Sequence, residues 1–284
     1  MPELPEVETV ARGVDQRVHG DRIVDVWFSS LPQTFKNPPH VQAAGLRDRR
    51  VQSVHRTGKH IVFELGPQDR KTRKRISRNE KIAAQWIVHL GMTGRLLVTR
   101  PEADVEKHTH ARLSLASGNE LRFVDPRRFG RLEFRDLANG AGFAAPGEEP
   151  LAIGAEEFAA LFHGRKLAIK AALLNQSLLA GVGNIYADES LYRAGIRPRR
   201  PAGRLSQEQL ERLRISLKDV LRAAIRLGGS SVSDYVDAEG ARGFFQLEHF
   251  VYQRTGEPCR RCGTPIKRIV VAGRSTHYCP KCQH

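Results

Sequence analysis

The chain has 284 residues, with 46 Lys or Arg against 31 Asp or Glu, which makes its formal net charge +15 at pH 7. This length suffices for two domains, and 40% hydrophobic residues is typical of globular proteins. So large a basic excess indicates a polyanionic partner, and nucleic acid is favoured over an anionic membrane surface. The sequence holds no run of about 18 apolar residues and no signal peptide, so we expect no membrane association and a cytoplasmic, nucleoid-associated protein.

The first third of the chain changes from a helical to an extended pattern. Residues 3–19 are expected to form a helix, because Val7, Val10, Val14 and Val18 recur at roughly helical spacing. From residue 22 to about residue 135, short β-branched and aromatic runs alternate with turn signals. Because no helical pattern intervenes regularly, an antiparallel sandwich or barrel is favoured over an α/β sheet.

The second half is expected to be helical up to a terminal hairpin. Residues 138–150 are rich in Ala, Gly and Pro, as a domain linker is, and helical signals follow residue 151. In the longest of these segments Ser206 and Gln209 form a capping-box pair, and Gly228 supplies a stop. Near Phe244 the chain is expected to become β-rich again.

All four cysteines lie in the last 26 residues, as two C-x2-C pairs, Cys259 with Cys262 and Cys279 with Cys282. Two close pairs joined by a longer spacer are typical of one tetrahedral zinc ion bound by four thiolates. Disulfides are the alternative, but intracellular proteins rarely keep them. With every position filled by protein, the expected Zn²⁺ is structural and no catalytic cofactor is implied.

These patterns together predict an α+β protein of two lobes. An N-terminal antiparallel β-sandwich with an N-terminal helix is followed by a helical lobe that ends in a zinc ribbon. The expected boundaries are 1–137 for the N-terminal domain, 138–150 for the linker, 151–243 for the helical domain and 244–284 for the zinc ribbon. Within the first domain, residues 66–81 carry seven basic residues and are interpreted as a solvated loop that adds non-specific attraction for phosphate.

Three further strings carry residues suited to nucleic-acid contact. HLGMTG at 89–94 flanks Met92 with glycines, and DPRRFG at 125–130 offers Arg127 for phosphate or base contacts and Phe129 as a wedge. GVGNIYADE at 181–189 frees backbone N–H groups at a helix start, which suits an anion, and Asn184 adds a donor. Taken alone, each string is ambiguous. Met92 by itself would be interpreted as ordinary core, DPRRFG also fits a polar turn with a buried aromatic, and GVGNIYADE also fits close helix packing at Gly181 and Gly183.

As a set, MPELPEVET, these three strings and the cysteine pairs resemble the formamidopyrimidine-DNA glycosylase and endonuclease VIII family of base-excision repair enzymes. The resemblance runs from Pro2 to Cys282, and Leu4 favours the formamidopyrimidine branch. It implies a helix–two-turns–helix fold for the DNA-binding domain, and a monomer that acts on double-stranded damaged DNA. It also implies a bifunctional glycosylase and AP lyase that flips and excises oxidised purines, such as 8-oxoguanine and formamidopyrimidines, and then cuts the strand by β,δ-elimination.

The resemblance also implies roles for individual residues. Pro2, exposed once Met1 is removed, would be the nucleophile that forms a Schiff base, Glu3 the general acid/base, and Glu6 a supporting carboxylate. Lys59 would contact phosphate beside the lesion. Five further positions match DNA contacts of the family, namely the gap-filling and wedging residues Met92, Arg127 and Phe129 and the phosphate-gripping residues Asn184 and Arg274. Lys170 is a further candidate for such a contact.

The chain departs from the family pattern in places, and this keeps the lesion preference open. The basic 66–81 segment is an insertion, Ser233 stands where many relatives carry Lys, and Gln253 replaces Gly. One alternative is the same chemistry with a preference for oxidised pyrimidines or abasic sites. The other is a non-catalytic paralogue that binds damaged DNA, against which the retention of Pro2, Glu3 and Lys59 argues.

Overall fold

The computed structural model describes residues 1–31, 34–68, 81–138, 140–231 and 235–284, which divide into two compact units. The first unit comprises 1–2, 6–144 and 230–243, and the second comprises 3–5, 145–229 and 244–284. Residues 69–80 of the basic 66–81 segment, and Ser233, lie outside the described residues, while 66–68 belong to a strand.

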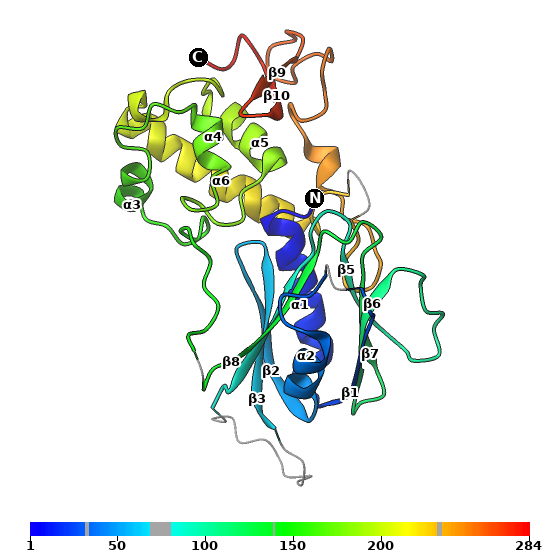
Figure 1. Ribbon diagram of the computed structural model, residues 1–284. Helices are drawn as coiled ribbons and strands as arrows, with labels where there is room; N and C mark the ends of the chain where they lie inside the picture. Colours follow the sequence, from blue (N-terminus) through cyan, green and yellow to red (C-terminus); the bar gives the residue numbers. More distant parts are fainter. Residues whose placement is uncertain (32–33, 69–80, 139, 232–234) are drawn as a thin grey trace. The chain divides into compact units, whose positions relative to one another are not determined.

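The first unit holds two four-stranded antiparallel sheets and two helices (Figure 1). One sheet has the order β1-β6-β7-β5, formed by Ile23–Phe28, Thr109–Leu115, Glu120–Val124 and Arg95–Thr99. The other has the order β2-β3-β4-β8, formed by Arg49–Thr57, His60–Gln68, Ala84–His89 and Arg131–Asp136. The expected antiparallel sandwich is confirmed.

Helix α1 (Leu4–Val18) runs between the two sheets and supplies much of their common core. Its buried face carries the valines that the sequence pattern singled out, Val7, Val10, Val14 and Val18, packed with residues of both sheets. Burial of a valine side chain contributes about 1.5–3 kcal/mol, so this face anchors the start of the chain firmly to the sandwich.

Two elements of this unit had no sequence prediction, helix α2 (Pro39–Leu46) and strand β2. In α2 the buried Gln42 donates to the carbonyl oxygens of Asn37 and Leu132, both at 3.0 Å. The bond to Leu132 joins residues 90 positions apart, so no local pattern announces it. In β2 the register shifts between Arg49 and Val51 and again before Ser53, which interrupts the alternation expected of a strand.

The second unit is built around helices α5 (Asn184–Ala194) and α6 (Gln207–Arg226). Its shorter elements are α3 (Ala155–Ala160), α4 (Ile169–Leu173), and the 3₁₀ turns η2 (Ala202–Arg204) and η3 (Phe245–Glu248). The capping box at Ser206 and Gln209 is present, and Gly228 has a positive φ of 74° directly after α6, so both helix signals are confirmed.

The chain after Phe244 differs from expectation in its first part. It forms the 3₁₀ turn η3 and irregular structure, and strands begin only with the antiparallel hairpin of β9 (Lys267–Val271) and β10 (Arg274–Tyr278). Phe245 is fully buried against Tyr186 of α5, with ring centroids 5.5 Å apart.

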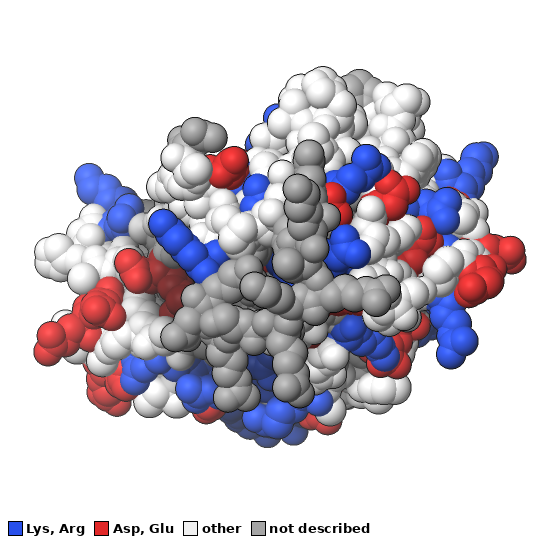
Figure 2. All heavy atoms as spheres, turned by 90° about the horizontal axis from the view of Figure 1, so that it is seen from below, with Lys and Arg blue, Asp and Glu red and all other residues white. Residues whose placement is uncertain are grey.

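Charges are mixed rather than segregated on the surface drawn in Figure 2, where Lys and Arg lie among Asp and Glu. Ion pairs within the first unit join opposite charges, such as Arg22 with Asp48 at 3.0 Å and Arg47 with Asp25 at 2.5 Å. Among the described residues, no helix is both long and apolar enough to cross a bilayer.

Candidate active site

The carboxylate of Glu3 lies buried against the N-terminus of helix α5. Its Oε1 accepts a hydrogen bond from the backbone N–H of Ile185 at 3.2 Å, and the residue is only 4% exposed. The backbone N–H of Leu4 donates to the carbonyl of Gly181 at 3.0 Å, which ties the chain start to the same loop. Helix N-termini favour negative charge, so this position suits an ionised carboxylate.

Gly183 is the residue that makes room for Glu3. A Cβ atom at this position would lie 2.1 Å from Cδ of Glu3, far inside van der Waals contact. The loop at 181–189 was expected to offer its N–H groups to an anion. The structure shows that Glu3 itself occupies part of this anion site, so one glycine of the string serves the carboxylate of the chain start.

Glu6 holds a different part of the chain, within the first unit. Its Oε1 accepts from the backbone N–H of Ser230 at 2.7 Å, and its carbonyl accepts from the Tyr235 hydroxyl at 3.4 Å. Burial, and secondly the charge of Glu6, raises the pKa of Tyr235 well above its ordinary value, so this hydroxyl stays protonated and donates. Glu6 therefore connects α1 to the segment that follows α6.

Pro2 and Lys59 both belong to the first unit. Pro2 is buried directly before α1, and Met1 is 46% exposed. Lys59 is half-buried in the turn between β2 and β3, next to Gly58, whose φ is +61°. Burial, followed by the charges of His60, Lys59 and other neighbours, lowers the pKa of His89 to about 4, so a neutral His89 lies near Lys59.

The structure brings the two strings HLGMTG and DPRRFG together as adjacent turns. A Cβ atom on Gly91, whose φ is +64°, would lie 2.5 Å from backbone atoms of Phe129 and Gly130. Only glycine allows this approach, and beside it Met92 and Phe129 are 38% and 48% exposed. The guanidinium of Arg127 lies over the Phe129 ring, 5.0 Å from its centroid. The three predicted DNA-contacting side chains thus form one exposed group.

The buried carboxylate of Asp125 organises this group, and the sequence analysis gave it no such role. Asp125 is fully buried and accepts from the Thr93 hydroxyl at 2.6 Å and the backbone N–H of Gly130 at 2.7 Å. It also accepts from the backbone N–H of Arg127 at 3.3 Å. One side chain therefore connects both turns, and the Asp–Pro start of the string was the available signal.

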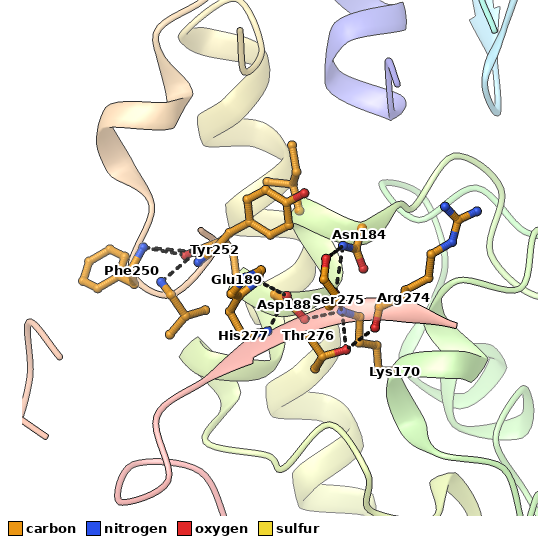
Figure 3. Close-up of polar contacts among 12 residues, drawn as sticks. Lys170, Asn184, Asp188, Glu189, Phe250, Tyr252, Arg274, Ser275, Thr276 and His277 are labelled. Carbon is orange, nitrogen blue, oxygen red and sulfur yellow. Dashed lines mark hydrogen bonds and ion pairs between the residues drawn. The ribbon is translucent and has the colours of Figure 1, made fainter. Parts of the chain in front are cut away.

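Lys170 and Asn184 contact the zinc-ribbon hairpin instead of pointing into solvent (Figure 3). The Nζ atom of Lys170 donates to the carbonyl of Ser275 at 2.8 Å and to Oγ1 of Thr276 at 2.9 Å. Nδ2 of Asn184 donates to the same Ser275 carbonyl at 3.0 Å. Arg274, one residue earlier, is exposed, and its side chain points away from these contacts.

Two acidic residues of α5 complete this region, and sequence reasoning gave neither a role. Asp188 is fully buried, 2.6 Å from Nζ of Lys170, and accepts from the backbone N–H of His277 at 2.8 Å. Burial lowers the pKa of Lys170, and the charges of Asp188 and of Glu3 oppose that effect. Glu189 accepts backbone N–H bonds from three consecutive residues, Phe250, Val251 and Tyr252, at 2.9–3.1 Å.

The four cysteines form one candidate metal site, with their sulfur atoms all within 4.8 Å of one another. Backbone N–H groups of Arg261 and Cys282 point at the sulfurs of Cys259 and Cys279, both at 3.4 Å, as is suitable for thiolates. The Tyr192 hydroxyl lies 3.2 Å from the sulfur of Cys259. Four close sulfurs with polar support fit one tetrahedral Zn²⁺, and the predicted ligand set is confirmed.

Of the departures noted in the sequence, Gln253 has a structural consequence. Its φ is +59°, a left-handed backbone conformation that residues other than Gly adopt at a cost of roughly 1–2 kcal/mol. The substitution of Gly therefore keeps the turn and adds strain to it.

Comparison with known proteins matches all three parts of the chain to family models. Residues 1–132 match the formamidopyrimidine-DNA glycosylase N-terminal domain, 146–236 the formamidopyrimidine-DNA glycosylase H2TH domain, and 256–284 the zinc finger found in FPG and IleRS. A formamidopyrimidine-DNA glycosylase of Solibacter usitatus is 45% identical over 283 residues, covering 100% of this chain and 99% of the relative.

Two solved structures are similar over their whole length. A Lactococcus lactis FPG mutant in complex with a Fapy-dG containing DNA is 33% identical, with a TM-score of 0.85 and 100% of both chains covered. A structure of MutM in complex with carbocyclic 8-oxo-G containing DNA is 34% identical, with the same TM-score and coverage. With three matching domain models and a full-length relative at 45% identity, the chain belongs to the formamidopyrimidine-DNA glycosylase family.

Proposed function

We propose that this protein is a bifunctional DNA glycosylase and AP lyase of base-excision repair, which excises oxidised purines from double-stranded DNA. The observation that carries the proposal is the buried carboxylate of Glu3, held on the N-terminus of α5 directly after the predicted nucleophile Pro2. The substrate class is supported by the similar solved structures, whose DNA contains Fapy-dG or carbocyclic 8-oxo-G.

The chemistry starts from the α-amine of Pro2 after Met1 is removed. An α-amine has a reference pKa of about 7.7–8.0 against about 10.4 for lysine, so a usable fraction is unprotonated near neutrality. Its attack on C1′ forms a C–N bond as the bond to the damaged base breaks, and the departing base takes a proton. The attached secondary-amine nitrogen then loses its proton and expels O4′, which is protonated as the sugar ring opens, and the resulting iminium ion acts as an electron sink.

Glu3 transfers the protons of this sequence, a general acid/base role typically worth about 10²–10⁴ in rate. Loss of a C2′ proton then expels the 3′ phosphate by β-elimination, and a second elimination expels the 5′ phosphate. We assign Glu6 a supporting role, because it accepts hydrogen bonds from Ser230 and Tyr235. Lys59 contacts the phosphate beside the lesion.

The remaining assignments concern extrusion of the damaged nucleotide, which costs a few kcal/mol. Met92, Arg127 and Phe129 fill the space left in the duplex and wedge the opposite strand, and their exposure on two joined turns supports this. Asn184 and Arg274 hold the bent backbone. Stabilising bent DNA offsets the cost of unstacking.

We further propose that the protein acts as a monomer at the nucleoid in the cytoplasm, where its substrate lies. The four-part division at 1–137, 138–150, 151–243 and 244–284 is proposed as the functional organisation. The four cysteines hold the structural Zn²⁺ that orders the hairpin bearing Arg274, and the reaction steps run through side chains and the chain start.

Borohydride reduction in the presence of lesion DNA tests the proposal. Protein whose N-terminus has been verified as Pro2 should be trapped covalently on both an abasic-site duplex and an 8-oxoguanine duplex. The variant Glu3→Gln should bind the 8-oxoguanine duplex yet give at least about 10²-fold less adduct. Protein that retains Met1 is the matched control and should give none.

The absence of an adduct with either duplex would contradict the enzyme assignment and favour a non-catalytic binder of damaged DNA. Trapping on abasic DNA without excision of any oxidised purine would instead move the substrate to abasic sites or oxidised pyrimidines. A panel of single-lesion duplexes cleaved under one set of conditions separates these outcomes.

A further inference from the structure

A buried ion pair between Lys170 and Asp188 supports the hairpin that carries Arg274. Both side chains are fully buried, and Nζ of Lys170 lies 2.6 Å from Oδ1 of Asp188. Lys170 makes two further bonds, to the Ser275 carbonyl and to Oγ1 of Thr276. The ammonium group therefore has three oxygen atoms close to it, two as hydrogen-bond acceptors and one as its ion-pair partner.

These bonds lead directly to the backbone of Arg274. The Thr276 hydroxyl accepts from Lys170 at 2.9 Å and donates to the carbonyl of Arg274 at 3.1 Å. The next carbonyl, that of Ser275, accepts from both Lys170 and Asn184. The two peptide carbonyls that follow Cα of Arg274 are therefore both fixed by side chains of the helical core.

Asp188 fixes the other end of the same strand. Its Oδ2 accepts from the backbone N–H of His277 at 2.8 Å and lies 3.3 Å from Nδ1 of the same residue. The hairpin tip itself is a tight turn, since Ala272 and Gly273 have φ values of +48° and +71°. Arg274 thus follows directly on the turn, on a strand whose backbone is held at the carbonyls of Arg274 and Ser275 and at the N–H of His277.

We propose that Lys170 is a positioning residue for Arg274, and that it acts on DNA only through the ion pair with Asp188 and the hydroxyl of Thr276. A direct phosphate contact would need Lys170 to reach the surface, but the side chain has no exposed area, and leaving would strand the buried Asp188 carboxylate. This role rests on the proposed function, because it gives Arg274 its task at the DNA backbone.

The test is a double-mutant cycle on binding to a duplex with a tetrahydrofuran abasic-site analogue, measured over a range of salt concentrations. Arg274→Ala should lower the salt slope by about one and raise Kd, as loss of one phosphate contact does. Lys170→Met should have a similar effect, about tenfold in Kd. The double variant should be no worse than Arg274→Ala, since the two residues form one unit.

Because Lys170→Met leaves the buried Asp188 carboxylate without its ion-pair partner and so endangers the fold, Thr276→Val provides a second route that leaves the ion pair in place. It removes only the hydroxyl between Lys170 and the Arg274 carbonyl, and we expect Kd to rise about threefold. Thr276→Ser, which keeps the hydroxyl, is the matched control and should bind the duplex with the Kd of the unmodified protein. In an Arg274→Ala background, Thr276→Val should have no further effect.

Additive effects of Lys170→Met and Arg274→Ala, with a slope change of about two, would show an independent phosphate contact and overturn the proposal. Wild-type binding by Thr276→Val would overturn it as well. Both results differ from failure of the proposed function, in which the wild-type protein gives no borohydride-trapped adduct. A protein that is trapped but shows additive effects contradicts the positioning role alone.

Discussion

At the scale of single residues, the site depends on close approaches that a linear string does not display. The sequence identified Glu3 and the glycines of GVGN as separate candidates, with the glycines serving an external anion. The structure joins them, because Glu3 takes the backbone N–H of Ile185 and Gly183 leaves it room. The residue types were predictable, whereas their pairing is a contact across about 180 residues of chain.

We expect Gly183→Ala to impair base excision more than binding. The added methyl group would lie 2.1 Å from Cδ of Glu3 and must displace the carboxylate. Loss of a positioned general acid/base lowers rates by about 10²–10⁴, so single-turnover excision should slow by at least about 10². Affinity for the lesion duplex should change by less than about threefold, because Glu3 is buried beside the helix end.

The control is Gly140→Ala, at a linker position where a Cβ atom would meet nothing within 4 Å. Its excision rate should equal that of the unmodified protein. Wild-type excision by Gly183→Ala would show that the carboxylate tolerates displacement, and would remove Glu3 from the role assigned to it.

At the scale of elements, local sequence patterns predicted the helices whose formation depends on local signals. The valine face of α1 and the capping box of α6 followed from spacing and end signals, and both are present. Helix α2 and strand β2 did not follow, because Gln42 bonds to the carbonyl of Leu132, 90 residues away, and β2 contains register shifts. Likewise, the chain was expected to become β-rich near Phe244, but residues Phe245–Glu248 form a 3₁₀ turn, and Phe245 packs against Tyr186 of α5.

A pair of histidines on the neighbouring strands β3 and β4 should make the free energy of unfolding depend on pH. His60 and His89 pair across these strands with ring centroids 4.8 Å apart, and His60 also packs on Phe143. Burial, more than any other cause, lowers the pKa of each to about 4. The unfolded chain therefore binds protons that the folded one does not between pH 6.5 and about 4.

In that window the free energy of unfolding falls as the pH falls, by up to about 1.4 kcal/mol per pH unit for each histidine. The variant His60→Phe keeps an aromatic ring and removes one titrating group, so its slope should be smaller by up to that amount. Denaturant unfolding at several pH values measures it. Phe143→Leu, which alters the packing alone, is the control, and an unchanged slope in His60→Phe contradicts the assignment.

At the scale of the whole molecule, neither compact unit is one continuous stretch of the chain. The expected linker at 138–150 spans the switch between units at residues 144 and 145. However, residues 3–5 cluster with the second unit and 230–243 with the first. Glu3 and Glu6, three residues apart, consequently bond to different units, Glu3 to Ile185 and Glu6 to Ser230.

Removal of the metal should abolish binding to damaged DNA. The cysteine site is part of a small core with Val251, Ile266 and Tyr192, and four-thiolate zinc sites of this size supply much of their own folding free energy. Without the ion the hairpin loses its anchor and Arg274 its position. We expect chelation to raise Kd by at least about tenfold, as measured by fluorescence anisotropy of a labelled abasic-analogue duplex.

Added Zn²⁺ should restore binding after the chelator is removed, and Cys262→Ser should reproduce the loss with no chelator present. Unchanged affinity in protein shown to be free of metal would mean that the hairpin folds without it. That outcome would leave the ion without a role in DNA binding.

The sequence by itself determined the zinc ligands from the spacing of the cysteines, and its motifs resemble those of the family and thereby implied the family's site residues, because motifs and their spacing are local properties of the chain. Only the tertiary structure decided which partner each of these residues has. The hydrogen bonds of Glu3, Asp125 and Lys170 join segments far apart in sequence. For a buried charged side chain, such contacts decide the free energy of burial, because an unpaired charge is costly in a low-dielectric core. This is why Lys170, a plausible surface contact in the sequence, is a buried support of the hairpin.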